Sequence, residues 1–278
     1  MTMEEVIGLR EMKTPIFYRR LVAEFLGTAI LVVFGCGSAL TVNPPLAPTV
    51  ISIAVAFGLT VATVIWSLGN VSGAHINPAV SVAMFATRKI SLTRCVAYII
   101  VQCLGGIVGG YFLWGVTPSH RRGTLGVTLV ADEITVWQGL VVEIIATFVL
   151  VLAIFASVDS KRTDHSGSTA LSIGLVVTMD IPWAIQYTGA SMNPARSLGP
   201  CVPTGLWQEH WVFWVGPILG ALVAGLLYEY VFAQRHQQEA GQRVQRHKVD
   251  PSVRDDKPNH GHLYIHGKDT RQCTLPEI

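Results

Sequence analysis

The sequence predicts an all-α membrane protein with six transmembrane helices and two re-entrant half-helices in an inverted repeat. Three observations support this fold class. Half of the 278 residues are apolar and only 14% are charged, whereas about 25% of the residues in a soluble domain are charged. The apolar residues gather in runs long enough to cross a bilayer. A nine-residue phrase occurs twice, each time between two such runs.

Six apolar runs reach the roughly 20 residues that a transmembrane helix needs. They cover residues 19–41, 49–69, 93–115, 137–158, 169–187 and 211–233. The first run contains Glu24 and lacks a small-residue cleavage pattern. We therefore expect a retained span rather than a signal peptide that is removed.

Two further apolar pieces, 77–87 and 193–202, are too short to cross, and each begins within the repeated phrase. The phrase reads GAHINPAVS at 73–81 and GASMNPARS at 189–197, so six of its nine positions are identical. Asn is a favoured N-cap and Pro is favoured at the first helical position. Each copy therefore predicts a half-helix whose positive N-terminal end lies inside the membrane.

The repeat also includes the first span of each half, where Glu24 in EFLGT matches Glu143 in EIIAT. Each half, 19–115 and 137–233, thus contains three spans and one half-helix between the second and the third. Because three is odd, the two halves enter the membrane from opposite sides, which defines an inverted repeat. The half-helices then enter from opposite faces and meet at the midplane.

Basic residues predict which side of the membrane each loop occupies. One face of a six-span chain has Arg121 and Arg122 in a single loop, besides Arg196 in the second motif. The other basic residues used here precede the first span and follow the first half-helix, the fourth span and the sixth span, all on the other face. The positive-inside rule places that face and both termini in the cytoplasm. We expect a cytoplasmic N-terminal segment at 1–18, a channel domain at 19–233, and a cytoplasmic, mostly disordered polar tail at 234–278.

Composition and motifs exclude several classes of function. The net charge of +2 is small and dispersed, so we expect no nucleic-acid partner. The five cysteines are odd in number and show no repeated spacing, which indicates neither a disulfide framework nor a zinc site. No nucleophile–base spacing, metal-ligand spacing or phosphate loop is found. We predict no enzyme, no catalytic residue, no metal and no cofactor.

The two motifs supply the chemistry of a pore for neutral solutes. Their matched residues are Asn77, Pro78, Ala79, Asn193, Pro194 and Ala195. The prolines start the half-helices, the alanines are small enough for the motifs to abut, and each asparagine caps its helix while keeping a side-chain NH₂ for the pore. A water that accepts from both amides points its hydrogens away along the pore, which interrupts proton hopping. The two positive helix ends oppose cations.

Three further residues near the motifs carry ionisable side chains. Intramembrane carboxylates such as Glu24 and Glu143 suggest proton relays by default, but the repeat matches them, so we expect them to brace the half-helix loops through backbone N–H groups. His75 lies on the cytoplasmic limb of the first motif. It is either a neutral pore-lining donor or a gate that titrates near neutral pH.

The doubled Asn-Pro-Ala within a six-span inverted repeat, with Arg196 directly after the second copy, resembles the aquaporins, or major intrinsic proteins. The resemblance covers about residues 15–233. It implies a right-handed bundle of six spans and two half-helices, a homotetramer with one pore per subunit, and a multi-pass protein of the plasma membrane whose partners are water, small neutral solutes and the lipid bilayer.

The same resemblance implies an outer constriction, the selectivity filter, with four walls. They are Phe57, Ile181, Ala190 and Arg196. Arg196 would donate hydrogen bonds and repel cations. Strict water channels of the family carry a His at the position of Ile181, so this chain departs from them. The Ile makes the constriction more apolar and admits urea, glycerol or peroxide.

Four functional hypotheses remain. The first is a passive water channel that also passes small uncharged solutes. Two features favour it: Ser197 stands where glycerol facilitators carry Asp, and Phe213-Trp214 matches the aromatic pair that water channels of the family carry early in the last span. The second is a glycerol- or urea-conducting channel, favoured by Ile181. The third is an ion-coupled secondary transporter, because inverted repeats occur there too. A membrane protein that uses the fold only for packing is a further alternative.

Overall fold

The computed structural model describes residues 3–160, 162 and 167–233, and the regular secondary structure in this part of the chain is entirely helical, without strands. The elements are α1 Met3–Ile7, η1 Leu9–Lys13, α2 Pro15–Ile30, η2 Leu31–Cys36, η3 Pro44–Leu46, α3 Val50–Ser72, α4 Pro78–Ala86, α5 Leu92–Val116, η4 Ser119–Arg121, α6 Val136–Val158, α7 Thr169–Thr188, α8 Pro194–Thr204, α9 Val212–Leu227 and η5 Tyr228–Phe232. The all-α prediction is confirmed. The tail expected at 234–278 lies outside the described residues.

Six spans are present, and their local chemistry explains where they begin. Five helices are long and apolar enough to cross a membrane: α3, α5, α6, α7 and α9 continued by η5. The sixth is α2, whose 16 residues continue into the six-residue π-helix η2 without leaving helical geometry. It begins at Pro15 rather than at residue 19, because Pro in the first position starts the helix one turn before the apolar run.

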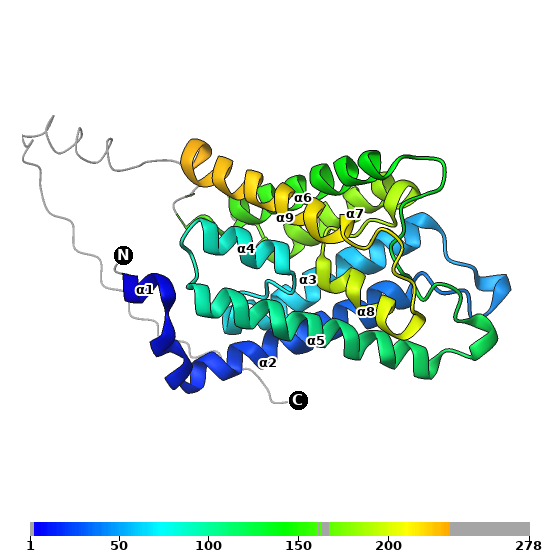
Figure 1. The fold of residues 1–278 in the computed structure, drawn as a ribbon, viewed down its shortest axis with the longest axis horizontal. Helices are drawn as coiled ribbons and strands as arrows, with labels where there is room; N and C mark the ends of the chain where they lie inside the picture. The colour runs from blue at the N-terminus through cyan, green and yellow to red at the C-terminus, as the bar shows by residue number, and fades with distance from the viewer. Residues whose placement is uncertain (1–2, 161, 163–166, 234–278) are drawn as a thin grey trace, which may run out of the picture. The chain divides into compact units, whose positions relative to one another are not determined.

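The two half-helices lie end to end in the interior of the bundle (Figure 1). They are α4, which follows the N-cap Asn77, and α8, which follows the N-cap Asn193. α4 packs against α9 and α8 packs against α5, so each half-helix is held by the last span of the opposite half. This exchange is what an inverted repeat requires.

Small residues allow the helix backbones of the bundle to approach closely. A Cβ atom on Gly58 of α3 would lie 2.5 Å from the carbonyl oxygen of Gly174 on α7. A Cβ on Gly109 of α5 would lie 2.8 Å from the carbonyl oxygen of Ala29 on α2, while Gly106 on the same helix contacts the backbone of α8. α5 therefore fixes the first span and the second half-helix together.

The N-terminal helix α1 and the end of the last span lie at the same end of the bundle (Figure 1). Ion pairs tie that end together. Lys89, after the first half-helix, pairs with Glu229 of η5 at 2.7 Å, and Arg94 of α5 pairs with Glu11 of η1. The basic residues used to predict sidedness therefore include two that sit at this end.

Candidate functional site

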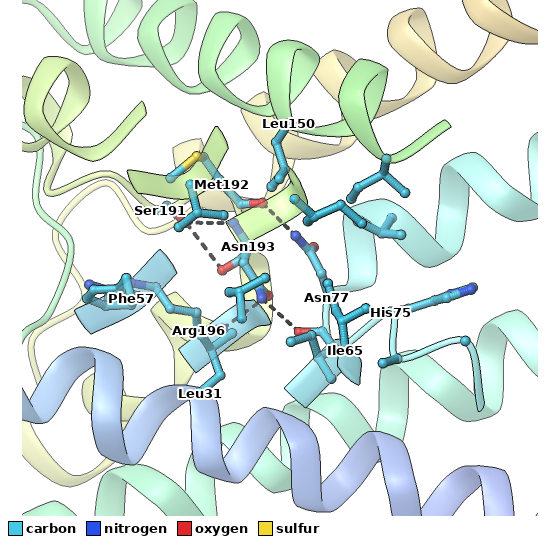
Figure 2. A pocket seen from close by; sticks show the side chains of 18 of the residues that line it. Leu31, Phe57, Ile65, His75, Asn77, Leu150, Ser191, Met192, Asn193 and Arg196 are labelled. Atoms are coloured by element: carbon cyan, nitrogen blue, oxygen red, sulfur yellow. Dashed lines mark hydrogen bonds between the residues drawn. The ribbon is translucent and has the colours of Figure 1, made fainter. Parts of the chain in front are cut away.

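Asn77 joins its own half-helix to the opposite motif. Its side-chain oxygen accepts a hydrogen bond from the backbone N–H of Ala79 at 2.9 Å, which caps α4. Its side-chain nitrogen donates to the carbonyl oxygen of Met192 at 2.8 Å (Figure 2). The residue is 4% exposed. One hydrogen of the amide is thus committed across the midplane.

Asn193 makes the reciprocal contacts. Its side-chain oxygen accepts from the backbone N–H groups of Ala195 and Arg196 at 3.0 and 3.2 Å, and its nitrogen donates to the carbonyl oxygen of Ile76 at 2.8 Å (Figure 2). The two motifs therefore exchange hydrogen bonds and fix the helix ends against each other. The expectation that the whole NH₂ stays free needs refinement, because one of its two hydrogens is used in each copy.

The loops that lead into the half-helices have matched, strained backbones. Three positions of each copy adopt positive φ angles: Gly73 at 94°, Ala74 at 46°, Ile76 at 45°, Gly189 at 78°, Ala190 at 55° and Met192 at 52°. Left-handed geometry in residues other than glycine costs of the order of 1 kcal/mol or more each. It persists only where surrounding contacts hold the backbone, and such residues cluster at functional sites.

Glu24 supplies those contacts in the first half. Its carboxylate accepts from the backbone N–H groups of His75 and Ile76 at 2.9 and 2.7 Å. It also accepts from the Ser72 hydroxyl at 2.6 Å and from the Gln102 side-chain amide at 2.8 Å. Glu24 is fully buried and does not line the cavity described below.

Glu143 does the same in the second half. Its carboxylate accepts from the backbone N–H groups of Ser191 and Met192 at 2.9 and 2.8 Å and from the Thr188 hydroxyl at 2.6 Å. Glu143 is also fully buried and absent from the cavity wall. Both carboxylates thus bind the loop backbone at corresponding positions of the repeat.

A cavity of about 250 Å³ passes the two asparagines and is lined by residues from both halves (Figure 2). Most of its wall is apolar, with side chains from η2, α3, α4, α6 and α7. The residues predicted from the sequence to line a pore share this one cavity: Asn77, Asn193, Phe57, Ile181, Ala190, Arg196 and His75.

Arg196 lines this cavity beside Phe57. Its Nη1 donates to the carbonyl oxygen of Gly126 at 2.7 Å, and its guanidinium lies 5.0 Å from the centre of the Phe57 ring. Its Nε is buried and has no hydrogen-bond partner among the described residues. Arg196 appears in none of the ion pairs found within the described part of the chain. Its charge is therefore not neutralised by a carboxylate there.

The remaining predicted cavity residues lie as follows. Ile181 and Ala190 are buried at 2% and 4% exposure, and both contribute apolar surface. His75 has its Nδ1 at 3.1 Å from the Ser81 hydroxyl, and its ring meets the edge of Tyr98 at 5.2 Å between centroids. The histidine is thus held in place on the cavity wall.

Sequence reasoning missed the loop that covers the second half-helix. This loop lies between η4 and α6, at 122–135. Besides the Gly126 carbonyl, it provides the Thr128 hydroxyl, which donates to the Ser197 hydroxyl at 2.7 Å, and the Ala131 N–H, which donates to the Tyr187 carbonyl oxygen at 2.9 Å. Gly126 has a φ of 73°. The glycines of this loop were the only available signal that its backbone adopts an unusual path.

Comparison with known proteins agrees with this geometry. The family model described as "Major intrinsic protein" matches residues 11–228. This chain belongs to the major intrinsic protein family. It is 52% identical to Aquaporin-4 of Mus musculus over 232 residues, which cover 82% of this chain and 71% of that protein. It is 48% identical to Aquaporin-2 of Bos taurus over 221 residues, which cover 80% of this chain and 81% of that protein.

A solved structure is similar as well. The aquaglyceroporin from Plasmodium falciparum matches with a TM-score of 0.70 at 26% identity, over 77% of this chain and 96% of that one. This member of the aquaporin family is therefore an integral, multi-pass membrane protein and a water channel, not an enzyme. The predicted family, fold class and main function are confirmed, and neither the transporter nor the packing-only alternative is supported.

Proposed function

We propose that water crosses this protein in single file past Asn77 and Asn193, while protons and ions are excluded. The observation that carries the proposal is the pair of exchanged 2.8 Å hydrogen bonds, which hold both half-helix ends beside one cavity. Each amide has a second hydrogen. In our proposal these two hydrogens donate to the oxygen of a passing water.

Proton exclusion follows from that orientation. A water whose oxygen accepts from both amides directs its own hydrogens outward along the file, so it cannot accept a proton from a neighbouring water. The two half-helix N-termini each add about half a positive charge, which opposes hydronium and metal cations. Glu24 and Glu143 brace the loops and take no part in proton transfer, because their oxygens accept from loop N–H groups and neither residue lines the cavity.

The filter in this proposal consists of Phe57, Ile181, Ala190 and Arg196. Arg196 donates to the passing solute and repels cations, a role supported by its position outside every observed ion pair among the described residues. Ile181 adds an apolar wall that offers no hydrogen bond. Small neutral solutes such as glycerol or urea therefore pass along with water, as a second cargo. His75 lines the opposite limb as a neutral donor.

Assembly and location are further parts of the proposal. We propose a homotetramer with one pore per subunit in the plasma membrane, with both termini in the cytoplasm. Large apolar side chains exposed on the outside of the bundle, such as Trp66 at 77% and Val22 at 64%, suit contact with lipid or another subunit. The basic residues gathered at the end that holds α1 support the cytoplasmic side.

The test is the ratio of glycerol to water permeability in proteoliposomes that contain the wild type, Ile181→His or Ile181→Leu. The imidazole replaces an apolar wall by a polar one, which disfavours the carbon chain of glycerol relative to water, so we expect the ratio to fall roughly tenfold in Ile181→His, within the range of one pocket contact. Ile181→Leu keeps the wall apolar and should match the wild type. An unchanged ratio in Ile181→His would show that this position does not set selectivity.

A further inference from the structure

The first span changes its helix type beside the cavity. Residues Leu31–Cys36 form the π-helix η2, and Leu31 lines the cavity. The repeat aligns this segment with 150–155 of α6, which is regular α-helix. π-helical turns are rare and are frequent at functional sites. Within this aligned pair of segments the π-helix is therefore present in the first half alone, which needs a local reason.

Gly35 of η2 lies directly against the Phe57 ring. A Cβ atom at Gly35 would be 2.6 Å from Cδ1 and 2.8 Å from Cζ of that ring. The ring also faces the Arg196 guanidinium, 5.0 Å from the ring centre. Phe57 is therefore held between the backbone of η2 and the filter arginine, and any side chain at position 35 would displace it.

Cys36, the next residue of η2, lies behind the arginine. Its side chain is fully buried. A Cβ atom on Gly126 would lie 2.9 Å from the Cys36 Cβ, so the two residues are packed together. The Gly126 carbonyl accepts the 2.7 Å hydrogen bond from Arg196, so Cys36 packs against the residue that holds the arginine.

We propose that η2 is the platform that sets the aperture of the filter: Gly35 positions Phe57, and Cys36 positions Arg196 through Gly126. This inference rests on the proposed filter. Gly35 and Cys36 are positioning residues, since neither lines the cavity. The π-helix thus places two consecutive residues behind two different walls of the filter. Gly35, which has no side chain, lies behind Phe57, and Cys36, which has a small one, lies behind Gly126 and Arg196.

The consequence of enlarging either residue follows from these contacts. At position 35 the obstructing atoms are the far end of a side chain, so the fold accommodates a methyl group by moving the Phe57 ring and not the backbone. At position 36 a larger side chain presses on Gly126 and shifts the carbonyl that holds Arg196. Either change alters the passage of the larger solute more than that of water.

The experiment is a double-mutant cycle on water and glycerol permeability in proteoliposomes, normalised to the amount of folded protein. In the wild-type background we expect Gly35→Ala to lower glycerol permeability roughly tenfold. In the Phe57→Ala background the ring is absent, and Gly35→Ala should change nothing. Gly115→Ala is the matched control, because nothing lies within 4 Å of its new methyl group.

The outcomes separate the inference from the proposed filter. Equal losses in both backgrounds would overturn the inference and leave the filter standing. A Phe57→Ala variant with an unchanged glycerol-to-water ratio would overturn the filter itself. If Gly35→Ala does not fold, Cys36→Leu should still change the ratio while Cys36→Ser should keep it, and an unchanged ratio in Cys36→Leu would then contradict the platform.

Discussion

At the scale of single residues, the two asparagines combine capping, cross-linking and donation to solute. Each makes a cap within its own half-helix and one hydrogen bond to the other motif. A buried hydrogen bond contributes about 1 kcal/mol, and an acceptor left buried without a partner costs about 1–3 kcal/mol. Replacing either amide therefore affects both the stability of the midplane and its electrostatics.

We expect Asn193→Asp to create a cation leak and to lower thermal stability. The carboxylate cannot donate to the Ile76 carbonyl, which faces Asn193 Nδ2 at 2.8 Å, and it places a negative charge where the helix ends now repel cations. Voltage clamp of expressing cells measures the leak. The control is Asn70→Asp, whose side chain is exposed near the end of α3. Ion conductance equal to the wild type would contradict this account of the motif.

His210, in the loop before α9, should make stability depend on pH. Burial lowers the pKa of His210. Its Nε2 accepts from the Trp214 indole N–H at 3.2 Å, which requires Nε2 to be unprotonated. The fold therefore favours the neutral ring. The stability that this contributes is present above the unfolded-state pKa of about 6.5 and is lost as the pH falls below it, because the unfolded chain then binds the proton first.

The measurement is the thermal unfolding midpoint in detergent between pH 7.5 and pH 5.5. The wild type should lose stability over this range, and His210→Gln should lose less. His120→Gln, at an exposed position, serves as the control. The same pH dependence in the wild type and in His210→Gln would show that this ring does not carry the effect.

At the scale of elements, the order of spans and half-helices was predictable from hydrophobic runs and from the Asn-Pro helix starts. The start of the first span was predicted less well, because Pro15 begins a helix before the apolar run does. The π-helix η2 was not predicted, since its sequence has no local pattern that distinguishes it from α-helix. The exchange of hydrogen bonds between Asn77 and Asn193 was missed for a similar reason: it depends on tertiary placement of the two loops.

The crossing of α3 and α7 should be sensitive to a single methyl group. Gly58→Ala places a Cβ 2.5 Å from the Gly174 carbonyl oxygen, and backbone atoms cannot move aside as a side chain can. We expect a loss of roughly 1–3 kcal/mol, as for other overpacked sites. Denaturant unfolding in detergent measures it, with Gly115→Ala on α5 as the matched control. Equal stability of the two variants would contradict the close crossing.

At the scale of the whole molecule, the inverted repeat organises both the fold and the cavity. The halves exchange half-helices, since α4 packs on α9 and α8 packs on α5. Corresponding carboxylates, Glu24 and Glu143, bind corresponding loop N–H groups. The symmetry was visible in the sequence. Two features that break it, the π-helix η2 and Arg196, lie beside the cavity, which Leu31 and Arg196 both line.

Sidedness is a prediction for the molecule in its native membrane. We expect epitopes fused to either terminus to be protected from antibodies in intact cells, and an epitope inserted at 123–124 to be reached. More of the basic residues that flank the spans lie at the end that holds α1 than in the loop with Arg121 and Arg122 at the opposite end. Permeabilised cells should expose all three epitopes. Staining of a terminal epitope in intact cells would reverse the proposed topology.

The central claim is that two half-helix ends, joined by Asn77 and Asn193, pass water and stop protons. Proteoliposomes with a pH-sensitive dye inside test it most directly, because osmotic shrinkage and proton flux can be followed in the same vesicles. We predict rapid shrinkage with a proton flux no higher than in protein-free vesicles. Shrinkage no faster than in protein-free vesicles, or a proton flux that rises with water flux, would contradict the claim.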